Sequence, residues 1–221
     1  MDTLFFVIEI LGTVAFAAAG AMVAIDKETD LFGVVFLAII TCFGGGITRD
    51  LLIGNILPLA FSSYLLLTVA AVTAIIVYIF AAIFKKKYVE NEKLISRINN
   101  YFDAAGLGLF AVMGTRVCME SGYTHPLVAI SMGMITCIFG GMIRDFSLRE
   151  IPFVLRKRIY AIAAIAGSGV YYVLFTLGLI EWASILIGAI TVFVIRILAT
   201  VFKWNMPKAI VFSEIEKKDT K

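Results

Sequence analysis

The chain of 221 residues is too apolar for a soluble protein of its length. Hydrophobic residues make up 61% of it, charged residues only 16%, and its mean hydropathy is +0.99. A soluble domain of this size has no interior large enough to bury so much apolar surface. The small net charge of +3 comes from lysines and arginines between apolar segments. Such a pattern favours contact with membrane lipids and argues against a nucleic-acid partner.

Seven apolar segments are long enough to cross a bilayer, because about 20 apolar residues span its ~30 Å hydrocarbon core. We place these spans near Leu4–Ile25, Leu31–Ile53, Leu59–Phe84, Tyr101–Met119, Pro126–Phe146, Ile159–Ile180 and Trp182–Phe202. We expect the first to be a true span and not a signal peptide, since Asp2 replaces a basic start and Glu9 interrupts it. The predicted fold is an all-α membrane protein with seven transmembrane helices.

Basic residues fall on one side of this arrangement. Of the nineteen lysines and arginines, fifteen lie in alternate loops or in the tail: Lys27, Lys85, Lys86, Lys87, Lys93, Arg97, Arg149, Arg156, Lys157, Arg158, Lys203, Lys208, Lys217, Lys218 and Lys221. The opposite side has only Arg116, and Arg49, Arg144 and Arg196 lie within or at the edges of spans. Cytoplasmic loops are enriched in such cations. We therefore expect a multi-pass membrane protein with its N-terminus outside and its C-terminus in the cytoplasm.

A ten-residue motif occurs twice. Thr-Cys-Phe-Gly-Gly-Gly-Ile-Thr-Arg-Asp (41–50) returns 95 residues later as Thr-Cys-Ile-Phe-Gly-Gly-Met-Ile-Arg-Asp (136–145), in spans 2 and 5. Phe16 in span 1 likewise resembles Phe110 in span 4, each followed by alanine and, four residues after the phenylalanine, by glycine. Because each unit has three spans, the second unit enters the membrane from the opposite side. The sequence therefore predicts two inverted three-helix repeats plus a seventh helix.

This repeat divides the chain into five parts. Residues 1–84 form the first three-helix repeat, 85–100 a cytoplasmic linker, 101–180 the second repeat, 181–203 the seventh helix, and 204–221 a cytoplasmic tail.

The glycines of the motif, Gly44-Gly45-Gly46 and Gly140-Gly141, predict a break or kink at membrane depth. A break is tolerated there only inside protein or beside water. Broken helices of inverted repeats hold the ion and substrate sites of transport proteins. The alternative is that the glycines only allow helices to pack closely. Their recurrence together with Arg-Asp favours a functional site.

Each motif ends in an arginine followed by an aspartate, Arg49-Asp50 and Arg144-Asp145. Charges inside spans face the protein interior or water and mark pathways or paired networks. Neighbouring residues of a helix point about 100° apart, so we expect each charge to find its partner on another helix. Glu9 and Asp103 are the nearest repeat-related carboxylates. The alternative is that the dipeptides anchor helix ends at the membrane surface.

Three threonines, Thr41, Thr48 and Thr136, either line a path or bond back to carbonyls of their own helix. We expect no catalytic residue, cofactor or resident metal. The chain has one histidine and three cysteines, without zinc spacing, a Walker A motif or a nucleophile elbow. The protein is therefore expected not to be an enzyme.

The paired Gly-Gly-x-x-Arg-Asp motifs on spans 2 and 5 resemble those of the prokaryotic trimeric intracellular cation (TRIC) channels, and the resemblance covers roughly residues 4–202. It implies a homotrimer with one pore per subunit, built around kinked spans 2 and 5 and lined by spans 1 and 4. Potassium and other monovalent cations would pass through it. On this resemblance the kinks would be Gly44, Gly45, Gly46, Gly140 and Gly141. Phe16 and Phe110 would be candidate gates, and Arg49, Asp50, Arg144 and Asp145 would be polar groups by the pore.

Three classes of function remain. A passive, potassium-permeable channel is favoured, because carbonyl and hydroxyl oxygens can replace the water around potassium. Related bacterial sequences are also labelled glycine transporters, so a small amino-acid transporter is the alternative. In that case arginine and aspartate beside an open helix end would hold a zwitterion. A purely structural membrane protein is the third class.

Overall fold

The computed structural model describes residues 3–61, 64–156 and 159–204. Within these ranges the secondary structure is helical and contains no strand. Seven helices are long and apolar enough to cross a membrane: α1 (Thr3–Asp26), α2 (Leu31–Leu52), α3 (Tyr64–Ile83), α5 (Glu92–Glu120), α6 (Pro126–Ser147), α8 (Ile159–Thr176) and α9 (Glu181–Val201). Short helices lie between them: η1 (Leu59–Phe61), α4 (Lys85–Glu90) and α7 (Phe153–Arg156). The predicted seven-helix membrane fold is confirmed.

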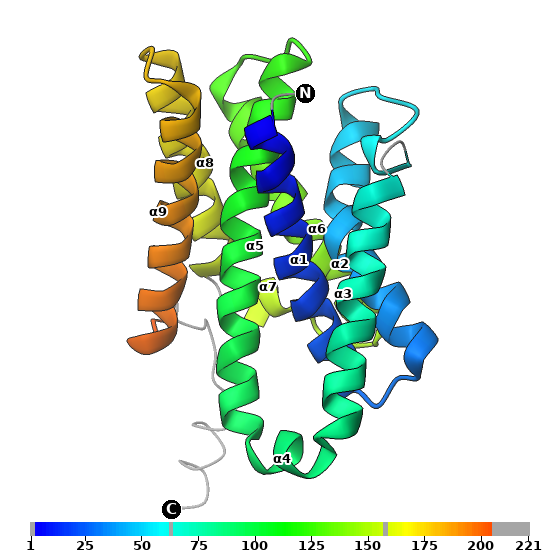
Figure 1. The fold of residues 1–221 in the computed structure, drawn as a ribbon. Coiled ribbons are helices and arrows are strands. Elements are labelled where there is room, and N and C mark those ends of the chain that lie inside the picture. The colour runs from blue at the N-terminus through cyan, green and yellow to red at the C-terminus, as the bar shows by residue number, and fades with distance from the viewer. Residues whose placement is uncertain (1–2, 62–63, 157–158, 205–221) are drawn as a thin grey trace, which may run out of the picture.

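The long helices run between two faces of the molecule (Figure 1). We call the face at which α1 begins the N face, and the opposite one, where α4 lies, the α4 face. Helix α1 runs from the N face to the α4 face, whereas its repeat counterpart α5 runs the other way. The units α1–α2–α3 and α5–α6–α8 are therefore inverted, and α9 packs beside α8 as the extra helix.

Two helix ends differ from the expected spans for local reasons. Helix α5 begins at Glu92 instead of Tyr101, and the carboxylate of Glu92 lies in its first turn, where it complements the positive end of the helix dipole. Helix α8 ends at Thr176, short of the expected Ile180. The next turn contains Gly178 at φ +85°, a conformation that suits glycine and stops a helix.

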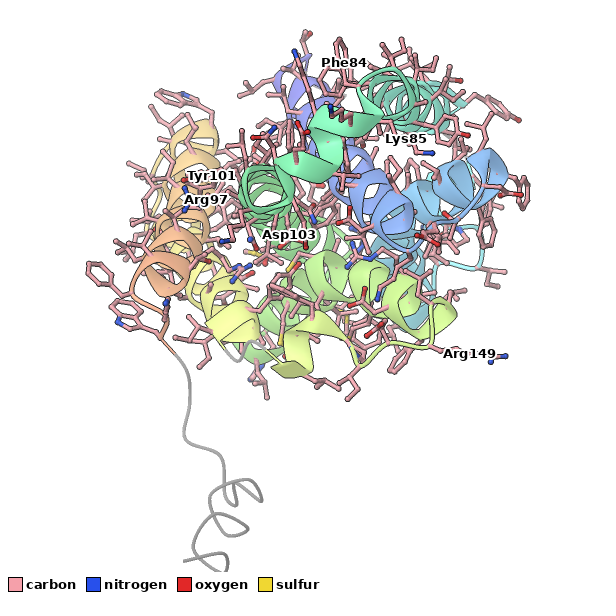
Figure 2. The ribbon with its side chains drawn as sticks, turned by 90° about the horizontal axis from the view of Figure 1, so that it is seen from below. Phe84, Lys85, Arg97, Tyr101, Asp103 and Arg149 are labelled. Atoms are coloured by element: carbon pink, nitrogen blue, oxygen red, sulfur yellow. The ribbon has the colours of Figure 1, made fainter. Side chains whose placement is uncertain are left out.

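Basic residues of the loops lie at the α4 face. Lys85, Arg97 and Arg149 lie at this end of the bundle (Figure 2). A salt bridge of 2.5 Å between Lys27 Nζ and Glu150 Oε1 joins two loops of the same face. The expected cytoplasmic cations Lys157 and Arg158, and the tail from residue 205 onward, lie outside the described residues.

Helices α2 and α6 are continuous through both glycine motifs, so neither helix is broken there, and the kink that the glycines also predict stays a prediction. The glycines instead let the two backbones touch. A Cβ atom on Gly45 would collide with the carbonyl oxygen of Thr136, and one on Gly140 would collide with the carbonyl oxygen of Thr41. Gly45 and Gly140 therefore let the helices pack closely at this crossing, where the two helices contact each other through equivalent residues of the two repeats.

The four neighbouring glycines of this crossing allow a matched test. A Cβ atom on Gly46 or Gly141 would meet only an arginine Nη2 atom at 3.7 Å, which is ordinary van der Waals contact. We expect Gly45→Ala to lower the free energy of unfolding by about 1–3 kcal/mol through overpacking. Gly46→Ala should leave stability unchanged or raise it by up to about 1 kcal/mol, since alanine favours helix.

Thermal unfolding of the two variants in detergent, followed by size-exclusion chromatography, measures this difference. Equal stability of Gly45→Ala and Gly46→Ala would show that the backbones of α2 and α6 are not in contact at Gly45.

Candidate functional site

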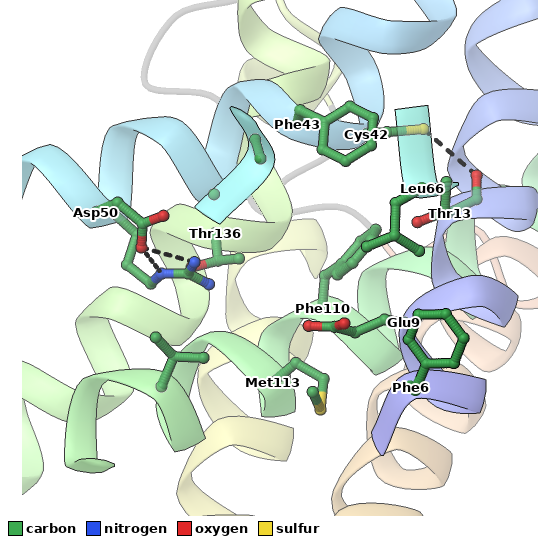
Figure 3. Close-up of a pocket in the computed structure, with 14 residues that line it drawn as sticks. Phe6, Glu9, Thr13, Cys42, Phe43, Asp50, Leu66, Phe110, Met113 and Thr136 are labelled. Atoms are coloured by element: carbon green, nitrogen blue, oxygen red, sulfur yellow. Dashed lines mark hydrogen bonds and ion pairs between the residues drawn. The ribbon is translucent and has the colours of Figure 1, made fainter. Parts of the chain in front are cut away.

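A cavity of about 220 Å³ opens within the N-face half of the bundle. Its walls come from the first half of α1 and the last halves of α2 and α5, and Thr136 of α6, Leu66 of α3 and Ala60 of η1 complete it. We call it the N-face cavity (Figure 3). Its polar lining residues are Glu9, Thr13, Arg49, Asp50 and Thr136, and its apolar ones include Phe6, Phe43, Phe110, Met113 and Val117.

Arg49 and Asp50 pair with each other at the wall of this cavity. Arg49 Nε and Nη2 donate to the same oxygen, Asp50 Oδ1, at 2.9 and 2.7 Å (Figure 3). The side chains are only 8% and 1% exposed. Two hydrogen bonds to one buried carboxylate make this a strong, charge-assisted contact. Both groups therefore lie inside the protein.

The second motif repeats this geometry. Arg144 Nε and Nη2 contact Asp145 Oδ1 at 2.9 and 2.8 Å, and the side chains are 6% and 9% exposed. The prediction that adjacent arginine and aspartate cannot pair is therefore wrong. The long arginine side chain folds back so that its guanidinium reaches the next residue, although the two Cβ atoms point apart. The second oxygen of Asp145 also accepts a hydrogen bond of 2.8 Å from the backbone N–H of Phe153, the first residue of α7.

Glu9 and Thr13 lie one helical turn apart on α1, and both line the N-face cavity (Figure 3). Sequence reasoning considered Glu9 only as a partner for arginine, and it missed Thr13. No hydrogen bond or ion pair of Glu9 occurs within the described ranges. Thr13 is 1% exposed, and its hydroxyl oxygen has no hydrogen-bond partner there either. The four-residue spacing of a carboxylate and a hydroxyl on an apolar span is the signal that could have identified both.

The three threonines singled out by their motifs bond back to their own helices. The hydroxyls of Thr41, Thr48 and Thr136 donate to Leu37, Gly44 and Met132 carbonyls at 2.7, 2.8 and 2.6 Å. Thr136 also lines the N-face cavity, whereas Thr41 is buried against Gly20. All three hydroxyls therefore bond to carbonyls of their own helix, as the second interpretation of these threonines predicted.

Phe16 and Phe110 meet where α1 crosses α5, with ring centroids 5.2 Å apart. Each ring lies on a glycine of the other helix, Phe16 on Gly106 and Phe110 on Gly12. Phe110 lines the N-face cavity and Phe16 is 2% exposed. The two candidate gate residues thus form an apolar layer at the deep end of the cavity.

A second, much smaller pocket, of about 10 Å³, lies in the other half of the bundle and includes Arg144 and Asp145. We call it the α4-face pocket. Its Asp103 is the repeat counterpart of Glu9, yet it is fully paired. Tyr160 Oη donates to Asp103 at 3.0 Å, and Arg196 Nη2 of α9 lies 3.4 Å from its other oxygen. The guanidinium carbon of Arg196 also lies 4.6 Å from the Tyr160 ring centroid. Sequence reasoning missed Arg196 because α9 lies outside the repeat that guided it, and it also missed Tyr160 of α8.

The comparisons with known proteins agree with this duplicated architecture. A family model described as "Glycine transporter" matches the chain twice, over residues 6–82 and 100–176. The membrane protein YvgT of Bacillus subtilis is 32% identical over 205 residues, covering 90% of this chain and 94% of that protein. The inner membrane protein YadS of Escherichia coli is 33% identical over 202 residues, covering 90% of this chain and 92% of that protein. Both carry the family name UPF0126.

Solved structures give the same fold. A TRIC channel orthologue from Rhodobacter sphaeroides superposes with a TM-score of 0.81 at 31% identity, over 92% of this chain and all of that one. A prokaryotic TRIC channel crystallised in 0.5 M KCl gives a TM-score of 0.83 at 31% identity, over 93% of this chain and all of that one. The chain belongs to the TRIC channel family, together with the UPF0126 membrane proteins and the sequences that the glycine transporter model describes.

Proposed function

We propose that the protein is a monovalent cation channel, permeable to potassium, with one pore in each subunit between α1, α2, α5 and α6. The observation that carries this proposal is the N-face cavity, where the arginine charge is already neutralised by Asp50 and a carboxylate, Glu9, has no ion-pair partner within the described ranges. Such a wall attracts cations. The likeness to TRIC channel structures supports the same function.

The pore would follow the axis of the inverted repeat. It would enter at the N-face cavity, pass the Phe16–Phe110 layer, and leave through the α4-face pocket, whose Arg144–Asp145 pair mirrors Arg49–Asp50. Gly46 and Gly141 are the motif glycines that line the two halves. Because α2 and α6 are unbroken, side-chain oxygens and not freed helix carbonyls would contact the ion. The α4-face pocket would be the narrow part of this path.

We also propose a homotrimer, as the name of the TRIC structures states for those proteins. A polar pore inside each subunit leaves the outer surface to apolar contacts. Large side chains such as Phe32, Ile76, Phe80 and Ile190 are exposed on the outside of the bundle, where they would face lipid or neighbouring subunits.

A small amino-acid transporter is the second candidate. The Glu9 carboxylate and the Arg49 guanidinium line one cavity, so they could contact the amino and carboxylate groups of a zwitterion. Purified protein in liposomes separates the two functions: we expect potassium flux down its gradient without accumulation of labelled glycine. Glycine uptake without potassium flux would reverse the assignment.

For the membrane orientation we propose that the N face lies outside a prokaryotic inner membrane and that α4 is cytoplasmic. Lys93 in the first turn of α5 and Ser121 after its end are both exposed, whereas the three native cysteines are buried. We expect a membrane-impermeant thiol reagent added to intact cells to label Ser121→Cys and not Lys93→Cys. The reverse labelling pattern would invert the topology.

The Arg-Asp pairs give a test of the pore. Asp50→Asn leaves the Arg49 guanidinium without its carboxylate beside the cation path, so potassium conductance should fall several-fold. The double change Arg49→Gln with Asp50→Asn removes both charges and should restore part of the conductance. Asp145→Asn should behave like Asp50→Asn, with Arg144→Gln as its second change.

Because loss of one partner from a buried ion pair costs about 3–5 kcal/mol, each variant is first checked for an intact oligomer by size-exclusion chromatography. Normal conductance of well-folded Asp50→Asn and Asp145→Asn at low and high salt would show that the Arg-Asp pairs do not lie along the conduction path.

A further inference from the structure

We propose that Glu9 and Thr13 form a binding site for a weakly hydrated monovalent cation in the N-face cavity, and that Glu9 makes this cavity selective for cations. This inference rests on the proposed channel function and adds to it a site outside the Gly-Gly-x-x-Arg-Asp motifs.

The first support is the placement of the two oxygens. Both residues line the cavity from the same wall, one turn apart on α1 (Figure 3). A hydroxyl buried away from water costs free energy unless it has a partner. Thr13 Oγ1 has none among the described residues, although the side chain is 1% exposed and borders the cavity. A bound ion, or the water that accompanies it, would satisfy this atom.

The second support is the charge balance around the cavity. Two arginines belong to this part of the bundle: Arg49 lines the cavity, and Arg116 precedes the lining residue Val117 on α5. Each of these has carboxylate partners of its own: Asp50 for Arg49 at 2.7 Å, and Glu120 and Glu181 for Arg116 at 2.6 and 2.7 Å. Within the described residues, Glu9 therefore supplies the unbalanced negative charge of the cavity wall.

The third support is the contrast between the repeats. At the position equivalent to Glu9, Asp103 is held by Tyr160 and by Arg196 of the extra helix α9, and the surrounding pocket is only about 10 Å³. At the position equivalent to Thr13 the chain has Leu107, which carries no hydroxyl. The carboxylate–hydroxyl pair thus belongs to one half of the duplicated fold, and it is not a by-product of the duplication.

The few oxygen ligands of the site favour a monovalent cation that is bound weakly. One carboxylate and one hydroxyl are hard oxygen ligands, and the remaining contacts of the ion would be water. Calcium needs 6–8 oxygen ligands, and no group of three acidic, histidine or cysteine side chains suited to a metal occurs among the described residues. A monovalent ion bound by few ligands can also leave quickly, as conduction requires.

The decisive experiment reads the electrostatic potential of the cavity without requiring conduction. Val117 lines the cavity and is half-buried. Val117→Cys is reacted from the N face with a trimethylammonium and with a sulfonate methanethiosulfonate reagent, and the wild-type chain gives the background rate. We expect the cationic reagent to be preferred, and Glu9→Gln to lower this preference by about tenfold.

The matched control is Glu120→Gln, which removes a carboxylate near the same face but outside the cavity lining. Because Glu181 still pairs with Arg116 in this variant, the reagent preference should change little. If Glu120→Gln and Glu9→Gln had equal effects, the reagent preference would come from the overall charge of the N face, and the proposed Glu9–Thr13 site would be wrong. Absence of any reaction at Val117→Cys would show that the cavity is closed to water and would also overturn it.

Ion selectivity is the second readout. The reversal potential in a KCl gradient should show that Glu9→Gln lowers the preference for potassium over chloride several-fold in 0.1 M salt. The loss should shrink in 1 M salt, where the screening length falls from about 10 to 3 Å. Thr13→Val should weaken potassium conduction without changing the reagent preference, and Thr13→Ser should retain both.

The two proposals fail differently. If the wild-type protein carries no potassium but Glu9→Gln still lowers the reagent preference, the result supports the Glu9–Thr13 site and contradicts the channel function. If potassium flows and Glu9→Gln changes neither reagent preference nor selectivity, the channel stands and the site is wrong.

Discussion

The backbone contact between α2 and α6 is the constraint on which the rest of the structure depends. Without side chains at Gly45 and Gly140, each helix places a glycine on a carbonyl of the other, Thr136 and Thr41. Any larger residue would push the helices apart. Because lipid gives helices no hydrophobic reason to associate, such close contact between small residues is a main source of packing energy in a membrane. It also fixes the two repeats relative to each other, since equivalent residues meet at the crossing.

Electrostatics then gives the two halves different properties. Each arginine of the motifs is neutralised by the aspartate that follows it, so the paired dipeptides can lie buried without leaving a free charge. What differs is the carboxylate on the preceding helix of each repeat. Asp103 is closed off by Tyr160 and Arg196, whereas Glu9 borders an open cavity. The seventh helix, which contributes Arg196, breaks the symmetry that duplication alone would produce.

Sequence patterns predicted the architecture well because hydropathy, loop charge and the repeated motif are all properties of the chain itself. The local geometry of the motif was harder to predict. Glycines in a span fit both a break and a close crossing, and the choice depends on whether another backbone lies opposite, as Thr136 does for Gly45. The Arg-Asp pairing was missed because Cβ directions ignore how far an arginine side chain can fold back. Arg196 was missed because its partner, Asp103, lies 93 residues away on another helix.

Recordings of unitary current in planar bilayers test the central claim most directly, because only a channel moves enough ions per second for single openings to be resolved. With the purified protein in asymmetric KCl, the account predicts discrete current steps that reverse toward the equilibrium potential of potassium. Bilayers that show no unitary steps, while the same preparation accumulates glycine in liposomes, would contradict it.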